Sequence, residues 1–168
     1  MSFRSVFVIA SVAVAFFVSV PARAGKLATF DGEWAVQWCD RGDPKAECGG
    51  FFLSLVQHGE RLCGSYDGAR VRLSQLDEGD SRAIHGVAIG REAVLTIESA
   101  RSGDIHLVRA TVRGDAMHWR IVDTIHDVDG DIDVLAYDNT LKRQSPTTPV
   151  SERRAGVLQD CAPVSAAR

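Results

Sequence analysis

The chain has 168 residues, of which 45% are hydrophobic and 24% are charged, and its formal net charge is −3 at pH 7. This is enough apolar material for one domain with its own core. The mildly acidic balance argues against binding nucleic acid or anionic lipid through bulk charge.

The first 24 residues have the pattern of a cleaved targeting segment. Arg4 precedes the uncharged run 5–21, and Ala22-Arg23-Ala24 places small residues where a signal peptidase reads them, so we expect cleavage after Ala24. The alternative is a membrane anchor, but the strongly apolar part, 6–20, is shorter than the ~20 residues of a spanning helix. Cleavage leaves no membrane span and changes the charge from 19 − 22 = −3 to 17 − 22 = −5.

Residue usage indicates where the protein works. Arginine outnumbers lysine by 16 to 3 and Asn139 is the single asparagine, as is typical of a GC-rich bacterial genome, so we expect a periplasmic or secreted protein. In such an oxidising compartment four cysteines predict two disulfides, for which three pairings are possible. We favour Cys39 with Cys48 and Cys63 with Cys161. The alternatives are a zinc site, which lacks close paired spacing, and a catalytic thiol at Cys63.

The first predicted strand follows the targeting segment. Trp34, Val36 and Trp38 alternate with smaller or polar residues, which is the period of a half-buried strand. The connection 40–49 contains glycine, proline and several charges, so it predicts a surface loop.

The segment 50–68 predicts a β-hairpin with a tight turn at His58-Gly59. Its apolar face points to the interior, and Cys63 lies on the other face, free to hold the C-terminal tail against the outside. The predicted register opposes Leu55 with Leu62, Leu53 with Gly64 and Phe51 with Tyr66.

Further along, we expect a short strand at 71–76 and an exposed acidic loop at 77–81. Evenly spaced strands joined by glycine-containing turns then predict an antiparallel meander. These strands are 83–89, 93–99, 105–112 and 117–125, with turns at Gly90-Arg91, Ser102-Gly103 and Gly114-Asp115. The last turn opposes Val112 with Met117, Ala110 with Trp119 and Val108 with Ile121.

A last strand is expected at about 132–141. The chain is therefore predicted to be all-β, with an up-and-down meander that closes into a barrel of eight or nine strands and so removes exposed sheet edges. The barrel domain would span 25–143. The tail 144–168 is rich in proline, serine and arginine and is expected to be irregular, with only 156–158 and Cys161 docking on the barrel.

Two short motifs carry a family resemblance. Gly32-Glu33-Trp34 opens the first strand, and Lys142-Arg143 closes the last. Together with the meander, they resemble the calycins, the group of lipocalin and avidin-like barrels. The resemblance implies that Trp34 plugs the closed end of the barrel and that Arg143, rather than Lys142, stacks on it. The second lipocalin motif, a turn of the Thr-Asp-Tyr type, is absent.

A third motif, Gly64-Ser65-Tyr66, resembles an early strand of avidins, but too few aromatic residues accompany it to rebuild a biotin cage. It is also similar to part of the inhibitory loop of periplasmic lysozyme inhibitors, which are small disulfide-bonded barrels. The ligand does not follow from either resemblance.

One acidic stretch could bind a metal. Aspartates recur at every second residue around Gly130, and oxygen ligands at such spacing can converge on Ca²⁺. However, the glycine lies two positions too early for a standard calcium loop. The alternative is an Asp-Gly turn with solvated carboxylates. The candidate ligands are Asp127, Asp129, Asp131 and Asp133.

Two arginines form a second candidate site. The predicted register places Arg109 opposite Arg120, and such like charges are unfavourable unless something anionic compensates them. They would bind an anionic ligand if they point into the barrel. Otherwise this face lies outside, and Glu98 or Asp133 balances the charge.

The sequence contains no nucleophile elbow, metalloprotease helix or phosphate-binding loop. We therefore expect a non-enzymatic barrel without a resident cofactor, which binds a small apolar or anionic ligand inside or an exported partner protein through its loops. A carrier needs an open cavity, whereas an inhibitor of a cell-wall-degrading enzyme needs a filled barrel with a projecting loop. A hydrolase built on 127–133 is a third alternative. The expected interior ligand-binding residues are Phe51, Leu53, Leu55, Tyr66, Arg109, Trp119 and Arg120.

Overall fold

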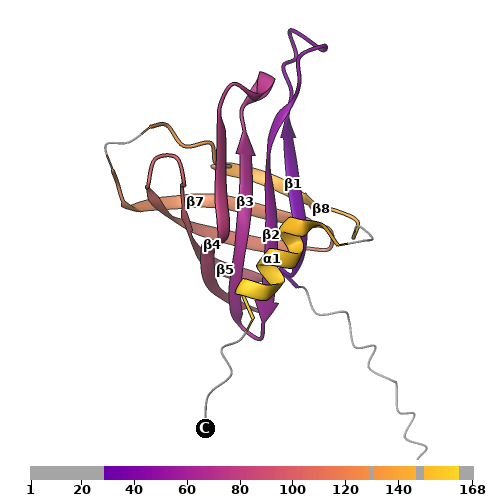
Figure 1. Cartoon of the computed structure of the whole chain (residues 1–168). Coiled ribbons are helices and arrows are strands. Elements are labelled where there is room, and N and C mark those ends of the chain that lie inside the picture. Colours follow the sequence, from indigo (N-terminus) through magenta and orange to yellow (C-terminus); the bar gives the residue numbers. More distant parts are fainter. Residues whose placement is uncertain (1–28, 129–130, 147–149, 163–168) are drawn as a thin grey trace, which may run out of the picture.

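The computed structural model describes residues 29–128, 131–146 and 150–162, and the expected targeting segment lies outside them. Eight antiparallel strands follow one another around a closed barrel, because β1 pairs with both β2 and β8 (Figure 1). This confirms the predicted fold class. The strands are β1 (Gly32–Trp38), β2 (Gly49–His58), β3 (Arg61–Ala69), β4 (Leu76–Ile89), β5 (Glu92–Glu98), β6 (Ile105–Arg113), β7 (Ala116–His126) and β8 (Asp138–Arg143).

The two ends of the barrel differ in their connections. At one end, here called the turn end, two-residue turns join β2 to β3, β4 to β5 and β6 to β7. Each turn begins with a glycine at positive φ, namely Gly59, Gly90 and Gly114. At the other end, here called the loop end, the longer connections 39–48, 70–75, 99–104 and 127–137 gather.

The hairpin of β2 and β3 corrects one predicted register. The turn is Gly59-Glu60 rather than His58-Gly59, so Leu55 lies opposite Gly64 and Leu53 opposite Tyr66. The glycine takes the first turn position, as in the other two turns. Because the error is two residues, every side chain keeps its predicted face. The register of β6 and β7 is as predicted, including Ala110 opposite Trp119.

Side chains fill the barrel interior. Phe51, at the centre, packs its ring 5.6 Å from that of Tyr66 and 5.9 Å from that of Trp119, measured between ring centroids. These two partners are fully buried, as are Leu53 and Leu55. The alternating pattern of the sequence therefore forms one continuous core.

The loop end departs most from the predicted elements. The expected strand 71–76 is a single 3₁₀ turn, η1 (Val71–Leu73), and the expected loop 77–81 belongs to β4. Asp77 in this segment is only 2% exposed. The last strand begins at Asp138 rather than near 132, and the residues before it form a loop.

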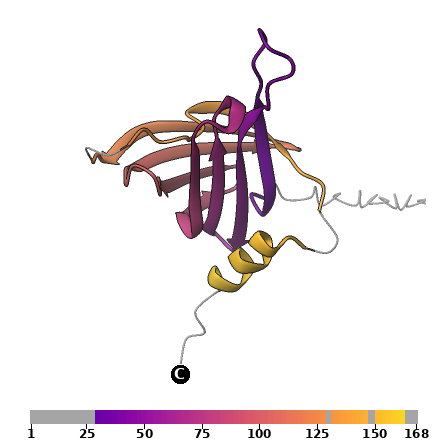
Figure 2. The ribbon, with the colours of Figure 1, turned by 45° about the horizontal axis from the view of Figure 1, so that its top comes forward.

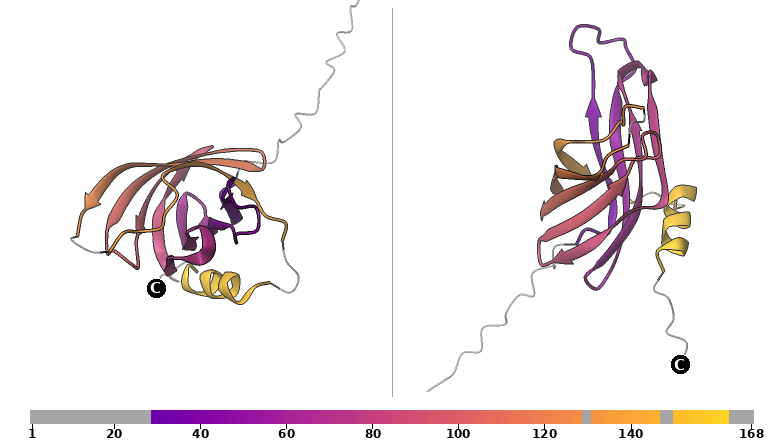
Figure 3. Two further views of the ribbon diagram at one scale, coloured as in Figure 1. Left: turned by 90° about the horizontal axis from the view of Figure 1, so that it is seen from above. Right: turned by 90° about the vertical axis from the view of Figure 1, so that its left-hand side faces the viewer.

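The tail is not wholly irregular, because it contains the helix α1 (Glu152–Asp160), whose N-cap is Ser151. Figures 2 and 3 show α1 against the outside of the wall formed by β2, β3 and β4. Val157 of the helix packs on Val56. Both favoured disulfides are formed, Cys39–Cys48 and Cys63–Cys161, and the second ties the end of α1 to β3. Within the described ranges, no helix has the length and hydrophobicity needed to cross a bilayer.

Candidate functional site

The turn end is covered by Trp34 and Arg143, as the calycin resemblance implies. The guanidinium carbon of Arg143 lies 3.9 Å from the centroid of the Trp34 ring, and the indole Nε1 donates to the carbonyl of Phe30. Arg143 also donates to the carbonyls of Asp31 and Thr29, at 2.5 and 2.6 Å. Burial lowers the pKa of Arg143, although Asp115 and Asp31 oppose this. The polar atoms at this closure are thus engaged in holding it together.

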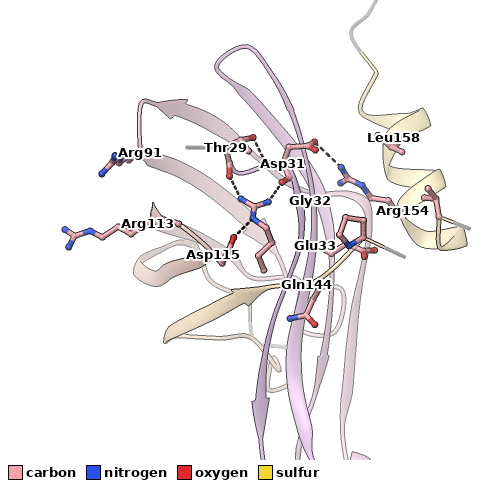
Figure 4. Close-up of a pocket in the computed structure, with 14 residues that line it drawn as sticks. Thr29, Asp31, Gly32, Glu33, Arg91, Arg113, Asp115, Gln144, Arg154 and Leu158 are labelled. Carbon is pink, nitrogen blue, oxygen red and sulfur yellow. Dashed lines mark hydrogen bonds and ion pairs between the residues drawn. The ribbon is translucent and has the colours of Figure 1, made fainter. Parts of the chain in front are cut away.

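A groove of about 830 Å³ lies beside this closure (Figure 4). Arg154 of α1 crosses it to pair with Asp31 at 3.0 Å, and Arg143 faces Asp115 at 3.8 Å. The side chains of Arg91 and Arg113 extend away from these pairs, and neither forms an ion pair with another described residue. Four arginines and three carboxylates line the groove, so the charge of its lining is only slightly basic.

The loop end is covered by residues 131–137, here called the plug segment. Val134 and Ala136 are buried, and the indole Nε1 of Trp119 donates to the carbonyl of Ala136 at 2.9 Å. A Cβ on Gly68 would lie 1.8 Å from the carbonyl oxygen of Val134, so only glycine lets the plug approach β3 this closely.

Asp77 holds the plug segment to the barrel wall. Its carboxylate accepts hydrogen bonds from the hydroxyls of Tyr66 and Ser99, both at 2.7 Å, and from the backbone N–H groups of Val134 and Arg101, both at 3.2 Å. Burial and the bond to Asp77 raise the pKa of Tyr66, which therefore stays protonated as a donor. This network satisfies a buried carboxylate that the sequence pattern placed in an exposed loop.

A second polar group lies where β6 begins. His106 is 2% exposed, and its Nε2 faces Oδ2 of Asp133 at 2.8 Å while its Nδ1 faces Oγ1 of Thr124 at 2.9 Å. The hydroxyl of Tyr137 donates to both oxygens of Asp133. Burial alone would raise the pKa of Asp133, but the bonds from His106 and Tyr137 hold it below its ordinary value. Burial and the adjacent Asp133 raise the pKa of Tyr137 to about 12.

The rim of the loop end carries a stapled loop, 39–48, which projects beyond the strands (Figures 1 and 3). Arg72 braces it, because its guanidinium contacts Asp43 at 3.1 Å and Asp40 at 3.4 Å, and its backbone N–H donates to the carbonyl of Glu47. Arg72 and Leu73 both have positive φ, which is rare for non-glycine residues and indicates a rim held in one conformation.

The arginine pair lies on the outside of the barrel, which corrects its expected interior placement. Arg109 and Arg120 do face each other across β6 and β7, but their side chains are 61% and 62% exposed. Arg109 pairs with Glu92 at 2.8 Å and Arg120 with Asp138 at 3.8 Å, rather than with Glu98 or Asp133. These residues therefore do not line an interior site.

The other expected ligand residues do point inward, but they leave no room. These side chains are only 0–1% exposed, so no space large enough for a water molecule lies next to them inside the barrel. The Gly64-Ser65-Tyr66 motif is also buried within β3, so it is not an exposed inhibitory loop. The residues that fill the interior in this way are Phe51, Leu53, Leu55, Tyr66 and Trp119.

The expected calcium ligands face different partners. Asp131 pairs with Arg101, Asp133 faces His106, and Asp127 is exposed. Asp129 lies outside the described residues.

Comparison of the chain with protein-family models, curated proteins and solved structures finds no match. The eight-stranded barrel is compatible with a calycin-like fold. The site residues therefore rest on geometry alone. Sequence reasoning missed Asp77 and His106. For His106 the available signal was a polar residue at an inward position of a predicted strand, whereas Asp77 gave no such signal because 77–81 was expected to be a loop.

Proposed function

We propose that the protein is an exported, non-enzymatic binding protein that engages another exported protein through the loop end of its barrel. The observation that carries the proposal is the filled interior beneath a stapled, projecting loop. A ligand carried inside would need space that these packed side chains do not leave. The two disulfides and the expected targeting segment support an oxidising compartment.

The rim has the composition of a protein interface. A recess of about 510 Å³ lies between the plug segment and the 70–75 connection, with Trp38 and Tyr137 in its lining. Ile132, which also lines it, is 62% exposed. Arg70, Ser74 and Asp133 add polar groups to this apolar and aromatic lining. Because a disulfide and Arg72 already order the stapled loop, binding costs little conformational entropy.

One constellation resembles a catalytic one, and its surroundings favour a binding role. Asp133, His106 and Thr124 follow the order of acid, base and hydroxyl nucleophile. The backbone N–H of Thr124 donates a hydrogen bond to Oδ1 of Asp123, so it is not free to stabilise an oxyanion beside the Thr124 hydroxyl.

Site-specific photocrosslinking tests the proposal. A photoreactive residue is placed at Arg41 in the stapled loop, at Ile132 beside the recess, and at Thr140 on the exposed side of β8 as a control. The first two positions should yield adducts with the same exported protein, and Thr140 should not. Adducts at Thr140 alone, or quenching of tryptophan fluorescence by a small-molecule pool without adducts at the rim, would overturn the proposal.

A quantitative version uses the captured partner and two matched arginines. Arg72→Ala removes the brace of the stapled loop and should weaken binding about tenfold, because the loop must then be ordered on binding. Arg120→Ala removes an arginine of similar exposure (62% against 61%) from the outer face and should leave affinity unchanged.

A further inference from the structure

The group around His106 brings three metal-ligating side chains together. His106 and Asp133 are buried, at 2% and 7% exposure, and Asp104 is partly buried. One ligand atom from each of the three lies within 4.8 Å of the other two. They come from different parts of the loop end: His106 from β6, Asp104 from the connection before it, and Asp133 from the plug segment.

Each of the three side chains is held by a separate partner. His106 Nδ1 faces Thr124 Oγ1, Tyr137 donates to Asp133, and Asp104 Oδ1 accepts from the backbone N–H of Val128 at 2.8 Å. Outer partners of this kind fix the orientation of metal ligands and the tautomer of a ligating imidazole.

The contacts of the His106 ring are compatible with ligation through Nε2. A metal would need the tautomer in which Nδ1 donates to Thr124 and the lone pair of Nε2 is free beside Asp133. Without a metal, Nε2–H donates to Asp133 and accounts for the 2.8 Å contact. Two carboxylates and a neutral imidazole carry a formal charge of about −2, which a divalent ion balances.

We propose that His106, Asp133 and Asp104 bind a divalent transition-metal ion, with Zn²⁺ as the best fit. One imidazole nitrogen and two carboxylate oxygens suit Zn²⁺ better than Ca²⁺, which takes six to eight oxygens. Three protein ligands leave a fourth position open, and Asp133 lines the recess at the rim. This site shares only Asp133 with the calcium ligands expected from the sequence, and it does not depend on the proposed partner binding.

The molecule contains a matched control. His118 Nε2 also faces an aspartate, Asp138, at 2.8 Å, but this pair is 55% and 60% exposed and belongs to no three-ligand group among the described residues. His118→Gln therefore tests whether a lone surface pair accounts for binding.

The test is Zn²⁺ titration of the tag-free mature protein against a chromophoric chelator, followed by thermal unfolding with and without Zn²⁺. We expect one site with micromolar or tighter affinity and a raised Tm. His106→Gln and Asp104→Asn should each lose at least tenfold in affinity, whereas His118→Gln should retain it. Asp104→Asn leaves the His106–Asp133 contact in place, so it separates ligand loss from misfolding.

A spectroscopic measurement distinguishes ligation from nonspecific binding. Co²⁺ in the wild-type site should give visible absorption bands that disappear in Asp104→Asn and persist in His118→Gln. The proposal is overturned if wild type shows no saturable Zn²⁺ binding at about 100 μM Zn²⁺, or if loss of affinity follows His118→Gln instead of His106→Gln. It is also overturned if Ca²⁺ raises the Tm and Zn²⁺ does not.

Discussion

The two ends of the barrel cover the same core with different chemistry. At the turn end, an indole stacked under a guanidinium closes the barrel, and tight turns connect the strands. At the loop end, the plug segment closes it, and a buried carboxylate holds that segment. The turn end resembles a structural cap, whereas the loop end combines ionisable groups, a recess and a braced loop. Binding chemistry usually lies on loops that a rigid scaffold positions, which supports the proposal that the loop end binds a partner.

The largest effect is expected at the turn end. Trp34→Ala removes a fully buried ring, its hydrogen bond to Phe30 and its stack with Arg143, so it should lower the free energy of unfolding by about 3–5 kcal/mol. Guanidinium unfolding measures this. Val36→Ala, a partly buried neighbour in β1, is the control and should cost roughly 1 kcal/mol. If the two variants lose the same free energy of unfolding, Trp34 contributes no more to the stability of the turn end than its neighbour does.

A comparable loss is expected when the plug segment is released. Asp77→Ala leaves three buried donors and the partly buried N–H of Arg101 without their acceptor, so it should cost about 3 kcal/mol. Tyr66→Phe removes one of these bonds and should cost about 1 kcal/mol. Hydrogen exchange at the Val134 amide should accelerate in Asp77→Ala but not in Glu78→Ala, whose side chain is exposed. Unchanged exchange in Asp77→Ala would mean that packing alone holds the plug.

A smaller loss tests the geometry of the cap. Arg143→Lys keeps the charge but loses the planar group that stacks on Trp34 and donates to two carbonyls, so it should cost about 1–2 kcal/mol. Lys142→Arg, at the adjacent exposed position, should have no measurable effect on the unfolding midpoint. If Arg143→Lys leaves the free energy of unfolding unchanged, Arg143 contributes to stability only through its charge.

The difference between the two ends also explains which features could be predicted from the sequence. Alternation and turn glycines are local signals, and they predicted the barrel and the face of nearly every core residue. The two disulfides were predicted from the number of cysteines and the expected oxidising compartment. The turn at Gly59-Glu60 was misplaced by one residue because both neighbouring dipeptides suit a tight turn. Asp77 could not be recognised, because its partners Ser99 and Val134 lie 22 and 57 residues away. The apolar run at 134–136 was predicted to lie within the last strand, 132–141, but it belongs to the loop that covers the loop end.

The smallest effect concerns a carboxylate near the loop end of β3. Asp67 forms an ion pair with Arg153 of α1, but its buried Oδ1 receives no hydrogen bond of good geometry. Burial raises the pKa of Asp67 despite Arg153, so the folded state binds its proton more tightly than the unfolded state. Its contribution is therefore most favourable below the unfolded pKa of about 3.9 and is lost as the pH rises through the folded pKa.

Asparagine imitates the protonated carboxyl, so Asp67→Asn should gain stability relative to wild type between about pH 4 and pH 7. The side chain of Asp67 is 31% exposed, which limits the gain to less than about 1 kcal/mol. Urea unfolding at both pH values measures the difference, and Glu98→Gln, at an exposed position, should show no such trend. If Asp67→Asn instead loses stability as the pH rises, the pair with Arg153 outweighs burial.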